Sequence, residues 1–123
     1  MATVATTRIP IQATVTATAV AISRGSRLTL QTNGLVSVSA IGVRGEYIAL
    51  QDIAASGSGV AAVTAAGGSV PVLASENVTL GQAAYSAASG ATSATSTNAV
   101  LMGKWKQATT NGTLGVVELA SVA

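Results

Sequence analysis

The side chains that could support acid–base chemistry in this sequence are few. The chain has no His and no Cys, which excludes Ser-His-Asp and Cys-His catalysis, disulfide bonds and the usual zinc ligands. Its carboxylates are Glu46, Asp52, Glu76 and Glu118. Hydrolytic mechanisms need paired carboxylates, but the spacing gives no reason for two of these to meet, so we interpret them as solvated surface groups. A Ser-Lys pair using Lys104 or Lys106 is a weaker alternative, because Ser is so frequent here that such a match carries little information. We expect no enzyme, no metal site and no cofactor.

Two glycine patterns resemble nucleotide-binding motifs but lack the rest of the motif. The segment 57–62 fits the dinucleotide pattern G-x-G-x-x-A, which requires a helix to follow within a βαβ unit. Gly67, Gly68 and Pro71 interrupt the chain too soon for that helix. Lys104 follows a Gly but has neither the upstream Gly nor the following Ser or Thr of a phosphate loop. We therefore predict no nucleotide site.

The charge distribution argues against nucleic-acid and membrane partners. The net charge is +2, from six Lys or Arg and four Asp or Glu, and the cations are scattered, whereas phosphate binding needs them clustered. No run reaches the ~18 apolar residues of a membrane helix. Arg8 and Pro10 interrupt any apolar segment at the N-terminus, so no secretory signal is expected.

The composition suggests a protein that works in contact with other chains. It is 49% apolar and 8% charged, with no Phe, and Ala and Val dominate the apolar set. With few large side chains and few charges, some surface is expected to be apolar, and such surface usually marks contact with another chain. We expect an oligomer or a larger assembly; the alternative is an ordinary small β domain with an Ala-rich core.

Short apolar runs separated by Gly, Ser, Thr and Asn are typical of strands joined by turns. We predict an all-β fold, a small sandwich or barrel of short, mostly antiparallel strands with an extended N-terminal arm. The candidate strands span 27–31, 35–39, 46–53, 60–64, 69–73, 80–85, 100–106 and 114–119. The Ala-, Ser- and Thr-rich segment 86–99 is expected to be a loop or a short helix, with the helix disfavoured by its β-branched and hydroxyl residues.

The sequence also predicts details of these strands. Asn33-Gly34 between alternating runs indicates a hairpin. A three-residue loop with Gly34 in the left-handed conformation pairs Leu30 with Val36 and Leu28 with Val38, which separates an apolar face from a polar one. Pro71 confines its strand to an edge or a bulge. In the segment 46–53, alternation places Tyr47, Ala49, Gln51 and Ile53 on one face, and Ile48 and Leu50 on the other.

We divide the chain into an N-terminal arm or extra strand, residues 1–23, and a single β domain, residues 24–123. Our hypothesis is that residues 2–12 form an arm that contacts a partner chain, because apolar anchors flank Arg8 and Pro10. The candidate partner-binding residues are Thr3, Val4, Arg8, Ile9, Pro10, Ile11 and Trp105. For Trp105 a core position is favoured and an interface position stays open.

The C-terminal half resembles a family of small capsid decoration, or cement, proteins of tailed phages. The similarity lies in Leu80-Gly81-Gln82-Ala83-Ala84-Tyr85, Gly90, Val100-Leu101-Met102-Gly103-Lys104-Trp105, Gly112 and Val116-Val117-Glu118-Leu119, within a looser match over 24–120.

This resemblance implies a structural protein of the bacteriophage virion, made in the host cytoplasm. It would bind the outer surface of an assembled icosahedral capsid and stabilise it by bridging coat subunits. The implied partners are the major capsid protein and the chain itself, as a homotrimer or a dimer. The alternatives are a tail or fibre-associated β module and a bacterial surface adhesion module.

Overall fold

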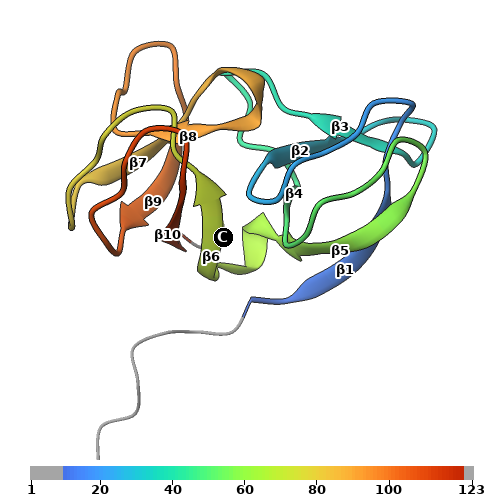
Figure 1. The fold of residues 1–123 in the computed structure, drawn as a ribbon, viewed down its shortest axis with the longest axis horizontal. Coiled ribbons are helices and arrows are strands. Elements are labelled where there is room, and N and C mark those ends of the chain that lie inside the picture. Colours follow the sequence, from blue (N-terminus) through green and yellow to red (C-terminus); the bar gives the residue numbers. More distant parts are fainter. Residues whose placement is uncertain (1–9, 121–123) are drawn as a thin grey trace, which may run out of the picture.

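The chain folds into two five-stranded antiparallel sheets, one from each half of the sequence (Figure 1). The computed structural model describes residues 10–120. The first sheet has the order β1-β5-β4-β2-β3, formed by β1 (Gln12–Thr16), β2 (Arg27–Leu30), β3 (Val36–Val38), β4 (Tyr47–Ala49) and β5 (Ser58–Val63). The second has the order β6-β10-β9-β7-β8, formed by β6 (Gly68–Leu73), β7 (Ala83–Ser86), β8 (Thr92–Ser93), β9 (Leu101–Trp105) and β10 (Leu114–Leu119).

The only helical turns among the described residues are two short 3₁₀ segments, η1 (Thr64–Ala66) and η2 (Ala88–Gly90). No helix in this part of the chain is long and apolar enough to cross a membrane. The prediction of a small all-β sandwich or barrel is therefore confirmed. The segment 86–99 contains η2 and the two-residue β8 and is otherwise loop, as its composition indicated.

The predicted register of the first hairpin is confirmed. Leu28 pairs with Val38 and Leu30 with Val36, and Gly34 has a φ of 84°, as the three-residue loop requires. Pro71 lies in β6, which is at the end of the strand order of its sheet. Because an edge strand pairs regularly on one side only, the N–H that Pro lacks is not needed for a hydrogen bond between central strands.

Two strands are shorter than the sequence indicated. In 46–53 the strand ends at Ala49. The N–H of Leu50 still donates to Val60 O at 3.0 Å, but the N–H of Val60 donates to the side-chain oxygen of Gln51 at 3.1 Å and not to a main-chain carbonyl. Ile53 makes an isolated bridge with Ile22 instead. In the predicted strand 80–85, β7 begins only at Ala83, since Gly81 has a φ of 88° and lies in a turn.

The two sheets are copies of one arrangement, which we call the first unit (residues 11–63) and the second unit (68–119). The strand orders become identical when β1 to β5 are matched with β6 to β10. From β2 to β5 the match is a constant shift of 56 residues: the pairs Leu28–Tyr47 and Ala49–Ala61 of the first unit correspond to Ala84–Gly103 and Trp105–Val117 of the second. The shift across β1 and β6 is 57, since Thr16 pairs with Ser58 and Leu73 with Leu114.

The turns between the strands repeat as well. Gly25 and Gly81 have φ angles of 87° and 88°. The N–H of Gly25 donates to Ala49 O at 2.8 Å, and that of Gly81 donates to Trp105 O at 2.9 Å. Because loops outside the ladders also coincide, the resemblance goes beyond a shared strand order and indicates an internal duplication.

Each sheet curls until its outer strands meet. A parallel bridge joins Ala17, just after β1, to Val36 in β3, and the equivalent bridge joins Ala74 to Thr92. These bridges connect the two ends of each strand order. Each unit is therefore a small barrel-like sheet, which reduces the length of free sheet edge.

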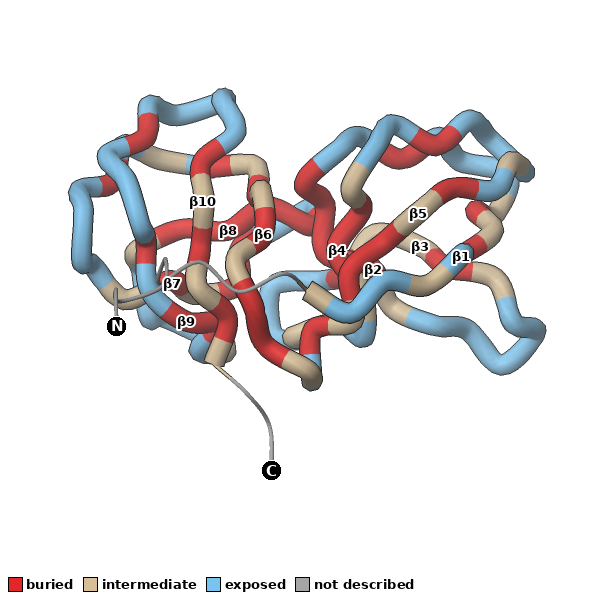
Figure 2. Tube along the Cα trace, turned by 90° about the horizontal axis from the view of Figure 1, so that it is seen from below, coloured by how far each residue is buried: buried red, intermediate tan, exposed pale blue. Residues whose placement is uncertain are grey.

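Two apolar clusters form the core. One lies within the first unit and contains Leu28, Val36, Ala49 and Ile53. The other belongs mainly to the second unit, around Trp105, but includes Ile48 and Ala62 of the first unit, with Leu50 packed against it. The predicted alternation is confirmed over residues 47–50, since the two faces of β4 contact different clusters. Gln51, predicted on the same face as Ala49, is exposed instead. In Figure 2 the buried parts of β4 and β6 lie on the neighbouring sides of the two lobes.

Candidate interaction surfaces

The carboxylates hold the backbone in place. Asp52 accepts the N–H of Arg24 at 2.8 Å, and Glu46 accepts that of Leu30 at 2.6 Å. Glu118 accepts a bond from the Ser69 hydroxyl at 3.0 Å. Over residues 10–120 no three acidic, His or Cys side chains gather where they could bind a metal ion. We interpret these contacts as structural.

Glu76 ties the loop after β8 to the turn after β6. Its Oε2 accepts the Thr95 hydroxyl at 2.7 Å and the Ala94 N–H at 2.9 Å. The hydrogen bond from Thr95, followed by that from Ala94, lowers the pKa of Glu76 below its ordinary value, because both donors favour the charged carboxylate.

Arg27 joins the two units. It is fully buried, and its Nε donates to Ala91 O of the second unit at 2.8 Å. Its two terminal nitrogens donate to Ala87 O of the second unit and to Val43 O of the first. Burial lowers its pKa to about 10, so the guanidinium keeps its charge at neutral pH. Sequence reasoning could not identify this role, because all of these acceptors are main-chain carbonyls distant in the sequence.

Arg44 makes a second connection of the same kind. Its NH1 donates to Leu101 O at 3.0 Å, and its NH2 donates to Ala120 O. Burial also lowers the pKa of Arg44. Guanidinium groups from the first unit therefore satisfy carbonyls within the second unit and at the residue that follows it, which fixes the relative position of the units.

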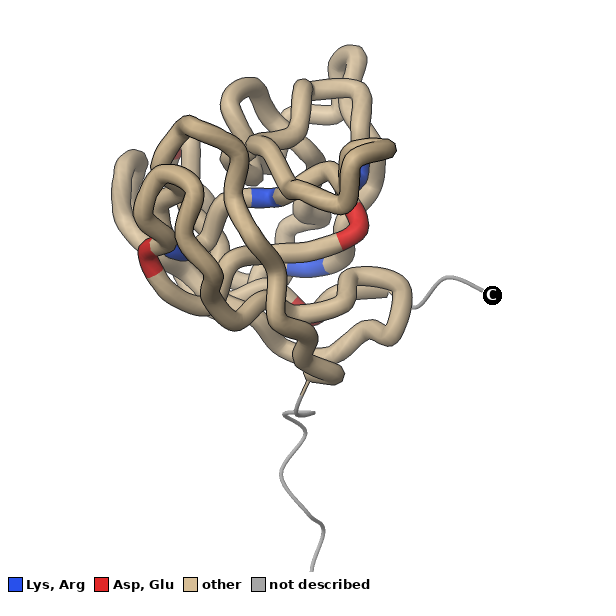
Figure 3. The backbone as a smooth tube through the Cα atoms, turned by 90° about the vertical axis from the view of Figure 1, so that its right-hand side faces the viewer, with Lys and Arg blue, Asp and Glu red and all other residues tan. Residues whose placement is uncertain are grey.

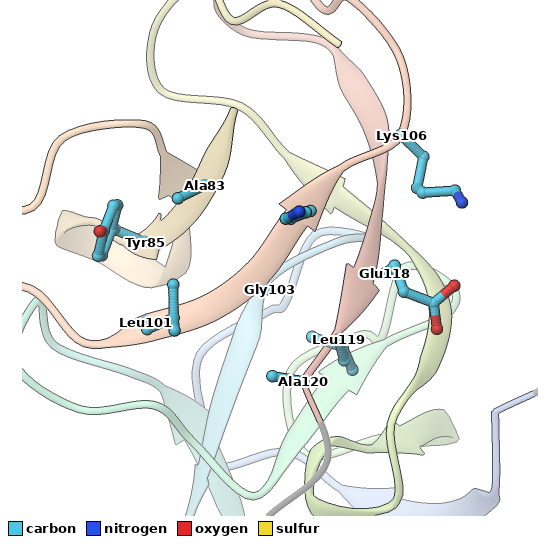
Figure 4. A pocket seen from close by; sticks show the side chains of 9 residues that line it. Ala83, Tyr85, Leu101, Gly103, Lys106, Glu118, Leu119 and Ala120 are labelled. Atoms are coloured by element: carbon cyan, nitrogen blue, oxygen red, sulfur yellow. The ribbon is translucent and has the colours of Figure 1, made fainter. Parts of the chain in front are cut away.

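A groove of about 550 Å³ lies on the outer face of the second unit, across β7, β9 and β10 (Figure 4). The groove is lined by Ala83, Tyr85, Leu101, Gly103, Lys104, Lys106, Glu118, Leu119 and Ala120. Leu101 is 49% exposed, and both lysines are exposed. The groove is therefore mainly apolar, with Lys104, Lys106 and Glu118 as its charged lining residues.

Other exposed apolar side chains are spread over both units. They are Ile11, Val20, Leu30, Ile41, Val43, Leu80 and Leu114. Figure 3 shows the few charged positions separated by long uncharged stretches.

The predicted partner-binding residues fall in three places. Trp105 is 1% exposed and donates its indole N–H to Ser93 O at 3.1 Å, so it is the core residue that the sequence favoured. Pro10 is half-buried against Gly68, and Ile11 is 62% exposed at the start of β1. Thr3, Val4, Arg8 and Ile9 lie outside the described residues, as does most of the proposed arm. Of the segment 1–23, residues 12–16 form β1, paired with β5.

Comparison with known proteins identifies a structural neighbour but no sequence family. No protein-family description matches the sequence, and no curated protein is detectably similar to it. The fold is similar to the crystal structure of the N base of head fiber gp8.5 in bacteriophage phi29, with a TM-score of 0.72 and 15% sequence identity. The match covers 89% of this chain and 95% of that one. At this identity the likeness establishes a common fold.

Proposed function

We propose that this chain is a structural protein of a tailed-phage virion, which binds the outer surface of the assembled capsid and stabilises it by bridging neighbouring coat subunits. The observation that carries the proposal is the fold shared with a phage head-fiber base over nearly the whole of both chains. The finer part, attachment to the capsid surface, comes from the sequence resemblance to cement proteins between Leu80 and Leu119, for which no protein-family description gives a match. On this proposal the chain is not an enzyme, and its partners are the major capsid protein and other copies of itself.

The stabilisation follows from mass action. A protein that binds the assembled shell but not separate coat subunits shifts the equilibrium toward the shell, by an amount that grows with its concentration relative to its dissociation constant. Self-association makes the attachment multivalent, so that weak contacts by each copy add up to firm binding. The low charge of the surface suits contacts with uncharged parts of the coat, because little desolvation of charge opposes them.

Co-sedimentation tests this proposal. The full chain is mixed with shells of the phage that encodes it, in the unexpanded and the expanded form. We expect the protein to pellet with expanded shells only, because the spacing of coat subunits that it bridges exists only there. Failure to pellet with either form would overturn the proposal.

A fibre-associated module is the second candidate, and the nature of the structural neighbour favours it. That neighbour is itself the N base of a head fiber, so a similar fold occurs in a protein that is part of a fibre. Electron microscopy of virions labelled on this chain separates the two. Label spread over the shell supports a decoration protein, whereas label confined to fibre attachment points supports a fibre base.

A further inference from the structure

Because the two units have the same fold, the contact made by the outer face of the first unit indicates what the equivalent face of the second unit can bind. The first unit buries the outer face of β2, β4 and β5 against the second unit. On that face Arg27, Ile48 and Ala62 are each 0% exposed. The equivalent outer face of the second unit, on β7, β9 and β10, holds Ala83, Lys104 and Glu118 at the same positions. Nothing within residues 10–120 covers this face, and the groove lies on it.

We propose that this open face binds the first unit of a second copy of the chain, head to tail, so that the contact between the two units of one chain is repeated between chains. The occupant follows from the intrachain interface, in which an equivalent face is covered by a unit of the same fold. Head-to-tail contacts use different surfaces on the two partners, and they form closed rings or filaments.

The duplication also identifies the surface of the second copy. Arg27 contacts Ala87 O and Ala91 O of the second unit, and a shift of 56 places Ala83 beside Gln31 and Leu35 of the next chain. Gly25 lies against Leu73 and Leu114, which correspond to Thr16 and Ser58. Gln31 and Ser58 are exposed, while Leu35 and Thr16 are half-exposed. The required surface is therefore accessible.

The composition of the open face fits a contact that forms after folding. Ile48, which is buried, and Leu50, which is half-buried against the core of the second unit, are replaced by Lys104 and Lys106 at the equivalent positions. The charged ends keep the separate chain soluble, while the lysine stems can still pack on apolar surface. Interfaces between independently folded chains are generally more polar than those within a core. We therefore expect a reversible contact.

Crosslinking tests the contact. Because the sequence has no Cys, a thiol-reactive crosslinker attaches only at the introduced Cys. Full-length Ala83→Cys and Gln31→Cys variants are treated with a short bis-maleimide, separately and mixed. We expect covalent dimers in the mixture and few in either variant alone. Equal crosslinking of Ala83→Cys with itself would indicate a symmetric contact and overturn the proposal, as would the absence of crosslinks in the mixture.

Sedimentation equilibrium provides a second measurement on uncrosslinked protein. Leu101→Glu, in the groove, should weaken self-association by about tenfold or more, because it places a charge in a desolvated contact. Ala55→Glu is the matched control, since Ala55 is exposed and its equivalent, Asn111, donates its N–H to Asn77 of its own unit, and it should leave association unchanged. Equal effects of the two substitutions would contradict the proposed surface.

This inference rests on the self-association included in the proposed function but not on capsid binding. A protein that crosslinks as expected but never pellets with shells would overturn the proposed function alone. A protein that pellets with shells but shows no head-to-tail crosslink would overturn this inference alone.

Discussion

Arg27 Nε and Ala91 O lie 2.8 Å apart in a bond that spans 64 residues and joins the two units. We predict that Arg27→Ala destabilises the fold by about 3 kcal/mol or more, because it leaves several buried carbonyls without a donor and opens a cavity. Denaturant unfolding measures the change. The control is Arg24→Ala, whose exposed side chain should contribute less than about 0.5 kcal/mol. Equal losses from the two substitutions would refute the joining role of Arg27.

Gly115 makes room for the one Trp of the chain. A Cβ at this position would lie 2.8 Å from the Trp105 ring and 2.2 Å from the Thr109 hydroxyl. We predict that Gly115→Ala costs about 2 kcal/mol through overpacking and shifts the Trp105 fluorescence. Gly42→Ala is the control, because its Cβ would meet nothing closer than Asn98 O at 3.8 Å. Unchanged stability and fluorescence in Gly115→Ala would contradict this packing.

Thr92 is fully buried, and its hydroxyl has no hydrogen-bond partner among the described residues. The equivalent residue of the first unit is Val36, also fully buried. We predict that Thr92→Val stabilises the protein by about 1 kcal/mol, since it removes an unsatisfied polar group at nearly constant volume.

The matched substitution is Thr109→Val, which removes a hydroxyl that donates to Gln107 O at 3.2 Å and should bring no such gain. Thermal unfolding compares the two variants. A loss of stability in Thr92→Val would mean that its hydroxyl is satisfied in solution.

Glu76 should contribute to the acid sensitivity of the fold. Because hydrogen bonds lower its folded pKa, its contribution is present above the unfolded pKa and is lost as the pH falls through the folded value. We predict that Glu76→Gln is less stable than the native chain at pH 7 and that the difference shrinks toward pH 3. Unfolding curves across this range provide the test; a difference independent of pH would show that the charge of Glu76 is irrelevant.

The N-terminal arm remains a prediction that can be tested without disturbing the sheet. Ile11 O accepts the N–H of Val63 at 2.7 Å, so the deletion should stop at residue 9. We predict that removing residues 2–9 abolishes capsid binding and leaves the circular dichroism spectrum unchanged. Full capsid binding by this shortened chain would remove the arm from the proposed attachment.

Local features of the fold could be predicted from the sequence wherever one steric rule or one hydrophobic pattern determined them. Alternation around Gly34 determined the hairpin register, and the missing N–H of Pro71 placed its strand at an edge. The duplication could not be predicted, because the units share few residues beyond turn and packing glycines such as Gly25/Gly81 and Gly59/Gly115.

The core residues differ even where the backbone coincides. Leu28, Ala49 and Ile53 of the first unit correspond to Ala84, Trp105 and Thr109 of the second. One large side chain replaces the volume lost at two other positions, and cores tolerate such exchanges when the total volume is preserved. The open face could not be predicted either, because it is recognised only by comparing the two units, and their sequences are too different to reveal the duplication.

Heat-induced release of packaged DNA measures most directly whether this chain stabilises the capsid, as we propose. Virions that lack this chain are heated with and without the purified protein, and the time to half release is recorded with a DNA-binding dye. The account predicts that added protein delays release, and that the delay saturates when the binding sites on the shell are filled. Release at an unchanged rate with saturating protein would contradict it.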